Sequence, residues 1–303
     1  MRALFILVAL LAFAPKASAC DVCGCSIGGN YFGILPQFHK HFVGLRWSDQ
    51  SSRSTHSLIS AKKGIFDNEA QIRSVDIISR FYPWRRVQML TLVPYHDFHR
   101  IEIGNETHNQ GVGDCSILAN FILLDSGDSL HQRWKHSVTV GGGVKLPTGR
   151  AGARDSEGKA LHENLQTGSG STDFMISATY TLRRGSWGLS SDVLGRLNTT
   201  NKNGYHFGNR VSGSTKVFYL KKIQEITLLP NAGVFSDYSD VSRDHQLYAQ
   251  GTGGTIALAT FGLDIYFGRF SAGYTHQIPV YQDLGGGKVQ SKQRWLATLN
   301  YNF

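Results

Sequence analysis

The sequence has 303 residues, a formal net charge of +9 and a mean hydropathy of −0.20. Glycine, tyrosine and phenylalanine are frequent while proline and methionine are rare, which favours strands and turns over helices. Beyond the N-terminus no stretch approaches the ~18 apolar residues that a transmembrane helix needs. A low hydropathy still allows a membrane β-barrel, because only every second residue faces lipid. The basic residues are scattered in an exported chain, so a nucleic-acid partner is not expected.

Residues 1–19 are expected to form a Sec signal peptide. Arg2 supplies the positive start, residues 4–13 are apolar, and Ala17-Ser18-Ala19 is a small-residue cleavage site. The mature chain would then begin at Cys20, and a partial lipobox leaves lipidation of this residue as an alternative. Residues 20–36 are rich in Cys and Gly and are expected to be a short irregular extension, either periplasmic or a plug inside a barrel.

From residue 37 to 303 the chain repeats segments in which apolar and polar residues alternate, the pattern of a strand with one apolar face. The predicted strands are 38–49, 71–82, 87–96, 114–124, 136–147, 172–182, 187–198, 209–220, 225–235, 255–265, 270–279 and 293–303. Each has on the order of ten residues, the length of a tilted membrane strand. The last one reads QRWLATLNYNF, and its Tyr-x-Phe ending resembles the closing strand of outer-membrane barrels, where the terminal Phe acts as an assembly signal.

The connections between these segments alternate between long and short. Long ones are expected at 50–70, 97–113, 148–171, 199–208, 236–254 and 280–292, and short ones near 83–86, 125–135, 183–186, 221–224 and 266–269. This is the phase of an antiparallel transmembrane β-barrel of about twelve strands in the bacterial outer membrane, with both termini in the periplasm. A secreted β-sandwich would show no such phase. The expected partners are the lipid bilayer, the barrel-assembly machinery and a small solute.

Four short stretches strengthen this interpretation. Val93-Pro94-Tyr95 is followed by GVGD at 111–114, by KLPTG at 145–149 and by GSGSTD at 168–173. In this order they resemble the transporter-like outer-membrane barrels of the "MetA-pathway of phenol degradation" family, over roughly residues 38–303. The resemblance implies one continuous barrel that passes small aromatic or other apolar molecules.

The N-terminal cysteines Cys20, Cys23 and Cys25 form the sharpest local chemical signal. Three thiols within six residues of an exported chain suit Cu(I) or Zn, with His39 and His41 as the nearest further ligands. Gly24 follows Cys23, so the c-type haem motif is absent. The alternatives are a disulfide with a spare thiol, or lipid attachment at Cys20. A copper-binding or copper-sensing protein is therefore the second functional hypothesis.

Charged residues on the polar phase of the strands are expected to face the lumen, where they pair across it or line a water-filled path. They are Lys40, Arg46, Asp76, Arg80, Asp114, Lys145, Asp173, Asp192, Arg196 and Asp264. The leading hypothesis is a channel for a small solute, an aromatic or apolar compound or a metal-related cargo, in which loops 148–171 and 236–254 gate. An outer-membrane hydrolase is the third hypothesis, but Ser116 and His96 have no motif that ties them together, so no enzyme is expected.

Overall fold

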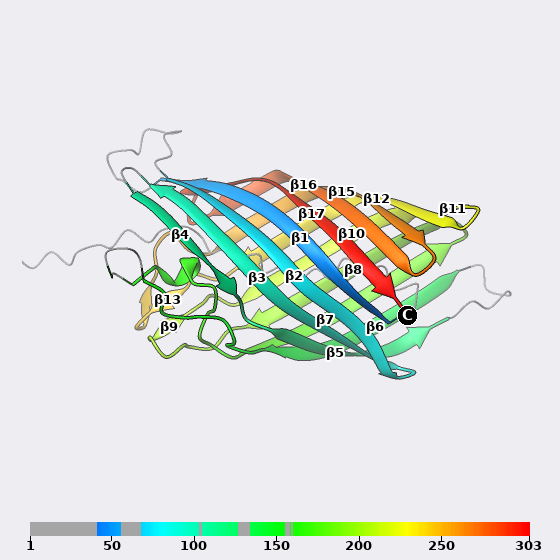
Figure 1. Cartoon of the computed structure of the whole chain (residues 1–303), viewed down its shortest axis with the longest axis horizontal. Coiled ribbons are helices and arrows are strands. Elements are labelled where there is room, and N and C mark those ends of the chain that lie inside the picture. The colour runs from blue at the N-terminus through cyan, green and yellow to red at the C-terminus, as the bar shows by residue number, and fades with distance from the viewer. Residues whose placement is uncertain (1–40, 56–67, 103–104, 127–133, 155–157, 159) are drawn as a thin grey trace, which may run out of the picture.

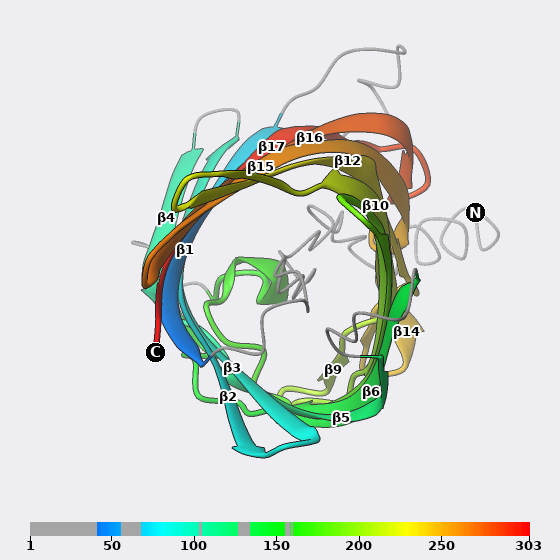
Figure 2. The ribbon, with the colours of Figure 1, turned by 90° about the vertical axis from the view of Figure 1, so that its right-hand side faces the viewer.

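A computed structural model describes residues 41–55, 68–102, 105–126, 134–154, 158 and 160–303. Twelve antiparallel strands form one closed barrel, as predicted (Figures 1 and 2). The strands are β1 (Phe42–Ser54), β2 (Asn68–Trp84), β3 (Val87–Glu102), β4 (Asn105–Val112) with β5 (Ser116–Asp125), β6 (Lys135–Lys145), β7 (Asp173–Arg184), β8 (Trp187–Leu197), β10 (Arg210–Tyr219), β12 (Ile226–Ser239), β15 (Gly254–Phe267), β16 (Phe270–Leu284) and β17 (Val289–Asn302).

The first and last strands close the ring. β1 pairs with β17 from Phe42 opposite Asn302 to Ser54 opposite Val289, and β10 pairs with β12 on the far side. β4 and β5 act as one interrupted strand, since both pair with β3. Because each strand is bonded on both sides over most of its length, the barrel has few free edges.

The barrel has an apolar outside and a largely polar inside, the reverse of a water-soluble protein. Along β1, Val43, Leu45 and Trp47 are each about half exposed, whereas Arg46 between them is 4% exposed. This follows from the two-residue period of a strand, which sends alternate side chains to opposite faces. At the end that carries the C-terminus, Trp84, Trp187, Phe267, Phe270 and Phe303 point outward, as in an interfacial aromatic girdle. Within the described residues, no helix is long and apolar enough to cross a membrane.

Short turns join the strands at the end of the barrel near the C-terminus, and the longer connections gather at the opposite end, here called the loop end (Figure 1). Two of the predicted loops are wrong in part. Residues 97–113 belong mostly to the β3–β4 hairpin, and residues 280–292 mostly to β16 and β17. These strands continue past the length needed to cross a bilayer, and residues 105–110 there are polar on both faces, so the alternation that marks a strand is lost in them.

Four small strands lie outside the twelve. β9 (Tyr205–His206), β13 (Arg243–Asp244) and β14 (Leu247–Tyr248) pair into a small sheet at the loop end, and β11 (Lys221–Ile223) extends the β10–β12 turn. The predicted loop 236–254 therefore contains the end of β12 and part of this sheet.

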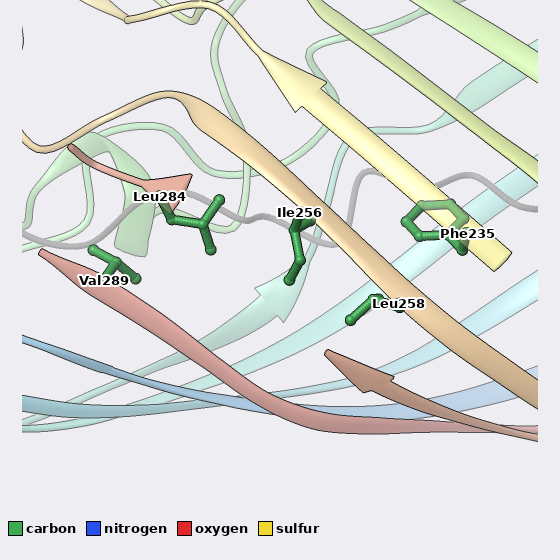
Figure 3. Close-up of a cluster of buried hydrophobic side chains, with 5 residues drawn as sticks. All are labelled: Phe235, Ile256, Leu258, Leu284 and Val289. Carbon is green, nitrogen blue, oxygen red and sulfur yellow. The ribbon is translucent and has the colours of Figure 1, made fainter. Parts of the chain in front are cut away.

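The inner face also carries apolar clusters. Figure 3 shows one, formed by Phe235 of β12, Ile256 and Leu258 of β15, Leu284 of β16 and Val289 of β17, with each side chain at most 4% exposed. The lumen is thus lined by apolar as well as charged surface.

Candidate functional site

Three charged side chains meet inside the barrel where β6 ends and β7 begins. Lys145, the last residue of β6, lies 2.9 Å from Asp114 and 2.7 Å from Asp173, the first residue of β7. Asp114 comes from the break between β4 and β5, and all three residues are at most 9% exposed. We call Asp114, Lys145 and Asp173 the Lys145 cluster. Two carboxylates around one ammonium are stable in such a place only because each charge has a partner.

The Lys145 cluster holds the connection between β6 and β7, residues 146–172, inside the barrel. The Ser169 backbone N–H donates to Asp114 Oδ2 at 2.8 Å, and its hydroxyl donates to the same oxygen at 2.6 Å. The Gly149 N–H donates to Asp114 Oδ1 at 3.0 Å. Figure 2 shows this connection within the ring of strands. A single buried carboxylate thereby binds both ends of the connection to the barrel wall.

The backbone of the connection crosses itself at two glycines. A Cβ on Gly168 would lie 2.3 Å from the carbonyl carbon of Gly149, and a Cβ on Gly149 would lie 2.6 Å from Gly168 Cα. Only residues without a side chain allow this approach. The three sequence stretches at 111–114, 145–149 and 168–173 therefore meet at one place. They supply Asp114, Gly149 and Gly168, respectively, to the crossing.

Described residues on both sides of the middle of the connection are also hydrogen-bonded to one another. The Gln166 side-chain oxygen accepts hydrogen bonds from the N–H groups of Gly152 and Ala153, at 3.0 and 2.7 Å, and its amide donates to the Leu161 carbonyl at 2.9 Å. A 3-10 turn, η1 (Glu163–Leu165), comes directly before Gln166, and its Leu165 packs on Ile72 and Phe98 of the inner wall. The connection is a bonded obstruction inside the loop end of the barrel.

Two further ion pairs line the wall at this level. Arg46 of β1 donates through Nε to Asp76 of β2 at 2.7 Å, and Arg210 of β10 holds Asp237 of β12 through Nε and a second nitrogen at 2.8 and 2.5 Å. His96 of β3 shares a hydrogen bond of 2.8 Å between its Nδ1 and Ser74 Oγ. Ser116 is buried on the same inner face, but the serine bonded to His96 is Ser74.

These groups surround a cavity of about 140 Å³ that residues of the β6–β7 connection also line. Its charged lining residues are Arg46, Asp76, Asp114, Lys145, Glu163, Asp173, Arg196 and Arg210, and its apolar ones are Leu92, Pro94, Phe98 and Phe207. Toward the C-terminal end of the barrel an apolar cluster follows, made of Leu90, Leu118, Met175 and Leu194. Gly143 lies between two of its members, so that Leu118 covers the glycine backbone. A molecule in the lumen would therefore meet charged and apolar surface in turn.

The other sequence-predicted lumen residues lie on the inner face in varied settings. Asp192 accepts from Ser214 at 2.7 Å, and Asp264 accepts from Asn231 at 3.1 Å. The Arg80 guanidinium lies 4.9 Å from the ring centroid of Phe42. Arg196 lines the cavity and has no hydrogen bond or ion pair with any described residue. The structure brings Asp114, Lys145 and Asp173 together, and it places Asp192 and Asp264 away from them.

The predicted metal ligands Cys20, Cys23, Cys25 and His39, and the predicted lumen residue Lys40, fall outside the described residues. His41 is described at the C-terminal end of the barrel, where its Nδ1 accepts from the Tyr82 N–H at 3.2 Å and its ring stacks on Phe303. Across the described ranges no three His, Cys, Asp or Glu side chains are arranged for a metal ion. Cys115, the one described cysteine, is free.

Sequence reasoning missed Arg210, Asp237 and Ser169. Arg210 begins its strand, and its inward phase is shared with Ser212, Ser214 and Lys216, so extending the polar phase would have found it. Asp237 falls in a range assigned to a loop. Ser169 belongs to the quoted GSGSTD stretch, but its contact with Asp114, 55 residues earlier, leaves no local signal.

No family model matches the chain, and no curated protein matches it. Among solved structures, the chain is similar to an outer membrane channel from Pseudomonas putida F1, with 10% identity, 89% of this chain and 97% of that chain covered, and a TM-score of 0.63. It is also similar to the β domain of the Bordetella autotransporter BrkA, with 11% identity, 87% and 100% covered, and a TM-score of 0.49. The first likeness shows that the chain has the fold of an outer membrane channel.

Proposed function

We propose that this protein is an outer-membrane channel for a small organic solute, closed in the described state by the β6–β7 connection. The observation that carries the proposal is the combination of an apolar outer belt with a charged, partly hollow interior at the Lys145 cluster. A hollow of this kind on the inner wall is what a solute path through the barrel requires.

The solute path runs from the loop end past the cavity to the C-terminal end. In the orientation expected from the sequence, the loop end faces outside and both termini face the periplasm. The cavity and the apolar cluster below it favour a molecule with an apolar body and a polar group. Small aromatic compounds, which the family resemblance implies, have this character.

Solute uptake into proteoliposomes tests the proposal. The purified full chain and a variant lacking residues 150–167 are compared with protein-free vesicles, using phenol and a large oligosaccharide as probes. We expect faster phenol entry with protein, a further increase in the deletion variant, and no oligosaccharide entry with the intact chain. Phenol entry equal to that of protein-free vesicles for both proteins would refute a channel function.

A further inference from the structure

The charged lining of the cavity is paired almost throughout. Lys145 is bonded to Asp114 and Asp173, Arg46 is bonded to Asp76, and Arg210 is bonded to Asp237 behind the lining. Glu163 accepts hydrogen bonds from the amides of Asn201 and Asn203 at 3.2 and 3.0 Å. A charged lining residue without such a partner is therefore a candidate for binding a charged ligand.

Arg196 of β8 is that exception. It lines the cavity, its Nε is buried without a hydrogen-bond partner, and no described carboxylate forms an ion pair with it. Its register partner on β10 is Arg210, so two guanidinium groups stand side by side. The carboxylates that act on Arg196 electrostatically are those of Asp173, Asp237 and Asp114. Each is already bonded to another cation.

The second guanidinium repels the first, and a bound anion compensates both charges. A carboxylate is the natural match, since the guanidinium fork donates two parallel hydrogen bonds to its two oxygens.

A second unsatisfied group lines the same cavity. Asp76 is 1% exposed, and its Oδ1 has no hydrogen-bond partner among the described residues, while Oδ2 is taken by Arg46. β2 and β8 stand five places apart in the ring of twelve strands, so Asp76 and Arg196 come from nearly opposite walls. A buried carboxylate oxygen of this kind accepts a hydrogen bond from a donor on the ligand.

The cavity surface between Arg196 and Asp76 is partly apolar and has room for an aromatic ring. Leu92, Pro94, Phe98 and Phe207 supply apolar lining to the cavity of about 140 Å³. A cavity of about 150 Å³ is known to hold one benzene ring.

We propose that the cavity is a binding site for a small aromatic carboxylate that carries a hydroxyl group, with the carboxylate held by Arg196 and the hydroxyl donating to Asp76 Oδ1. This inference names the solute class of the channel proposed above and rests on that function. Arg196 is the group that selects for the anion, and Asp76 the group that selects for the hydroxyl.

Calorimetric titration of the full chain in detergent micelles tests the site with three probes. They are 4-hydroxybenzoate, which has both groups, benzoate, which lacks the hydroxyl, and phenol, which lacks the carboxylate. The variants are Arg196→Gln and Asp76→Asn. Arg73→Gln is the matched control, because Arg73 is 53% exposed on the outer surface. Heat-modifiable gel mobility verifies that each protein is folded.

We expect the unsubstituted chain to bind 4-hydroxybenzoate best, benzoate less well and phenol least. Arg196→Gln should weaken both carboxylates by about tenfold or more and leave phenol unchanged. Asp76→Asn should remove the advantage of 4-hydroxybenzoate over benzoate, and Arg73→Gln should bind as the unsubstituted chain does.

Equal binding by Arg196→Gln and the unsubstituted chain, or phenol binding as tight as that of 4-hydroxybenzoate, would overturn the proposal. If a variant does not fold, the order of affinities of the three probes for the unsubstituted chain still tests the proposal. Phenol uptake into proteoliposomes without carboxylate binding would leave the channel function standing and this inference refuted.

Discussion

Two lysines of this barrel have carboxylate partners in opposite surroundings. Lys145 lies inside, 9% exposed, between Asp114 and Asp173. Lys292 of β17 lies at the loop end, 36% exposed, and bonds to Glu69 of β2, which is 46% exposed. The chemistry is the same, but only the inner lysine holds a connection across the lumen. From this difference we expect that burial, rather than the number of ion pairs, decides which contact shapes the lumen.

The largest effect is expected from Lys145→Met. It leaves Asp114 and Asp173 buried without their cation, which costs about 3–5 kcal/mol. The free energy of unfolding in urea, followed by tryptophan fluorescence in micelles, measures it. Lys292→Met is the matched control, and equal losses in the two variants would show that the buried cluster has no special role.

A smaller effect is expected from Gly168→Ala. The new methyl group would overlap the Gly149 backbone, so the crossing of the β6–β7 connection must open at a cost of about 1–3 kcal/mol. Limited proteolysis should then cut within 146–172 faster than in the unsubstituted chain. Gly195→Ala is the control, since the nearest atom to a Cβ there is the Ile176 carbonyl oxygen at 3.9 Å, an ordinary contact. A cleavage rate unchanged by Gly168→Ala would contradict the close packing of the crossing.

The residues changed in these two variants belong to a contact that the sequence predicts only in part. The alternation found all twelve strands because the bilayer imposes a two-residue period on every one of them. It also selected Asp114, Lys145 and Asp173 by their polar phase. It could not join them, because their contact depends on a 27-residue connection folding inward, and no local pattern encodes that path.

The same limit explains the errors at the strand ends. Residues 105–110 read NETHNQ, which is polar on both faces, so the β3–β4 hairpin looked like a loop. Outside the bilayer nothing requires one face to be apolar. Pairing with the neighbouring strand β3 makes these residues a strand, and the alternation of apolar and polar residues gives no sign of that pairing.

The exposed pair should contribute little. Lys292→Met is expected to lower the free energy of unfolding by less than about 1 kcal/mol at pH 7, since solvent screens both charges. Raising the salt concentration should shrink the difference further. A loss as large as that of Lys145→Met would refute the distinction between the two lysines.

The smallest effect is the pH dependence of this outer pair. Glu69 is the second residue of β2, beyond the roughly ten residues that cross the bilayer, and the hydrogen bond from Lys292 lowers the pKa of its carboxyl below the usual 4.5. A lowered folded-state pKa stabilises the protein above the unfolded-state pKa, and this contribution is lost as the pH falls through the folded-state pKa. The difference in free energy of unfolding between the unsubstituted chain and Lys292→Met, measured with urea, should therefore be present at pH 7 and shrink as the pH falls below 4.5. A difference that grows on acidification would contradict the assignment.

Single-channel recording in planar bilayers tests the central claim most directly, that this barrel is a channel closed by a connection bound to the Lys145 cluster. The unsubstituted chain, Lys145→Met and Lys292→Met are compared in the same lipid and salt. We predict small, infrequent openings for the unsubstituted chain and for Lys292→Met, and a larger and more persistent conductance for Lys145→Met. Conductance that is absent from all three proteins, or identical in them, would contradict the account.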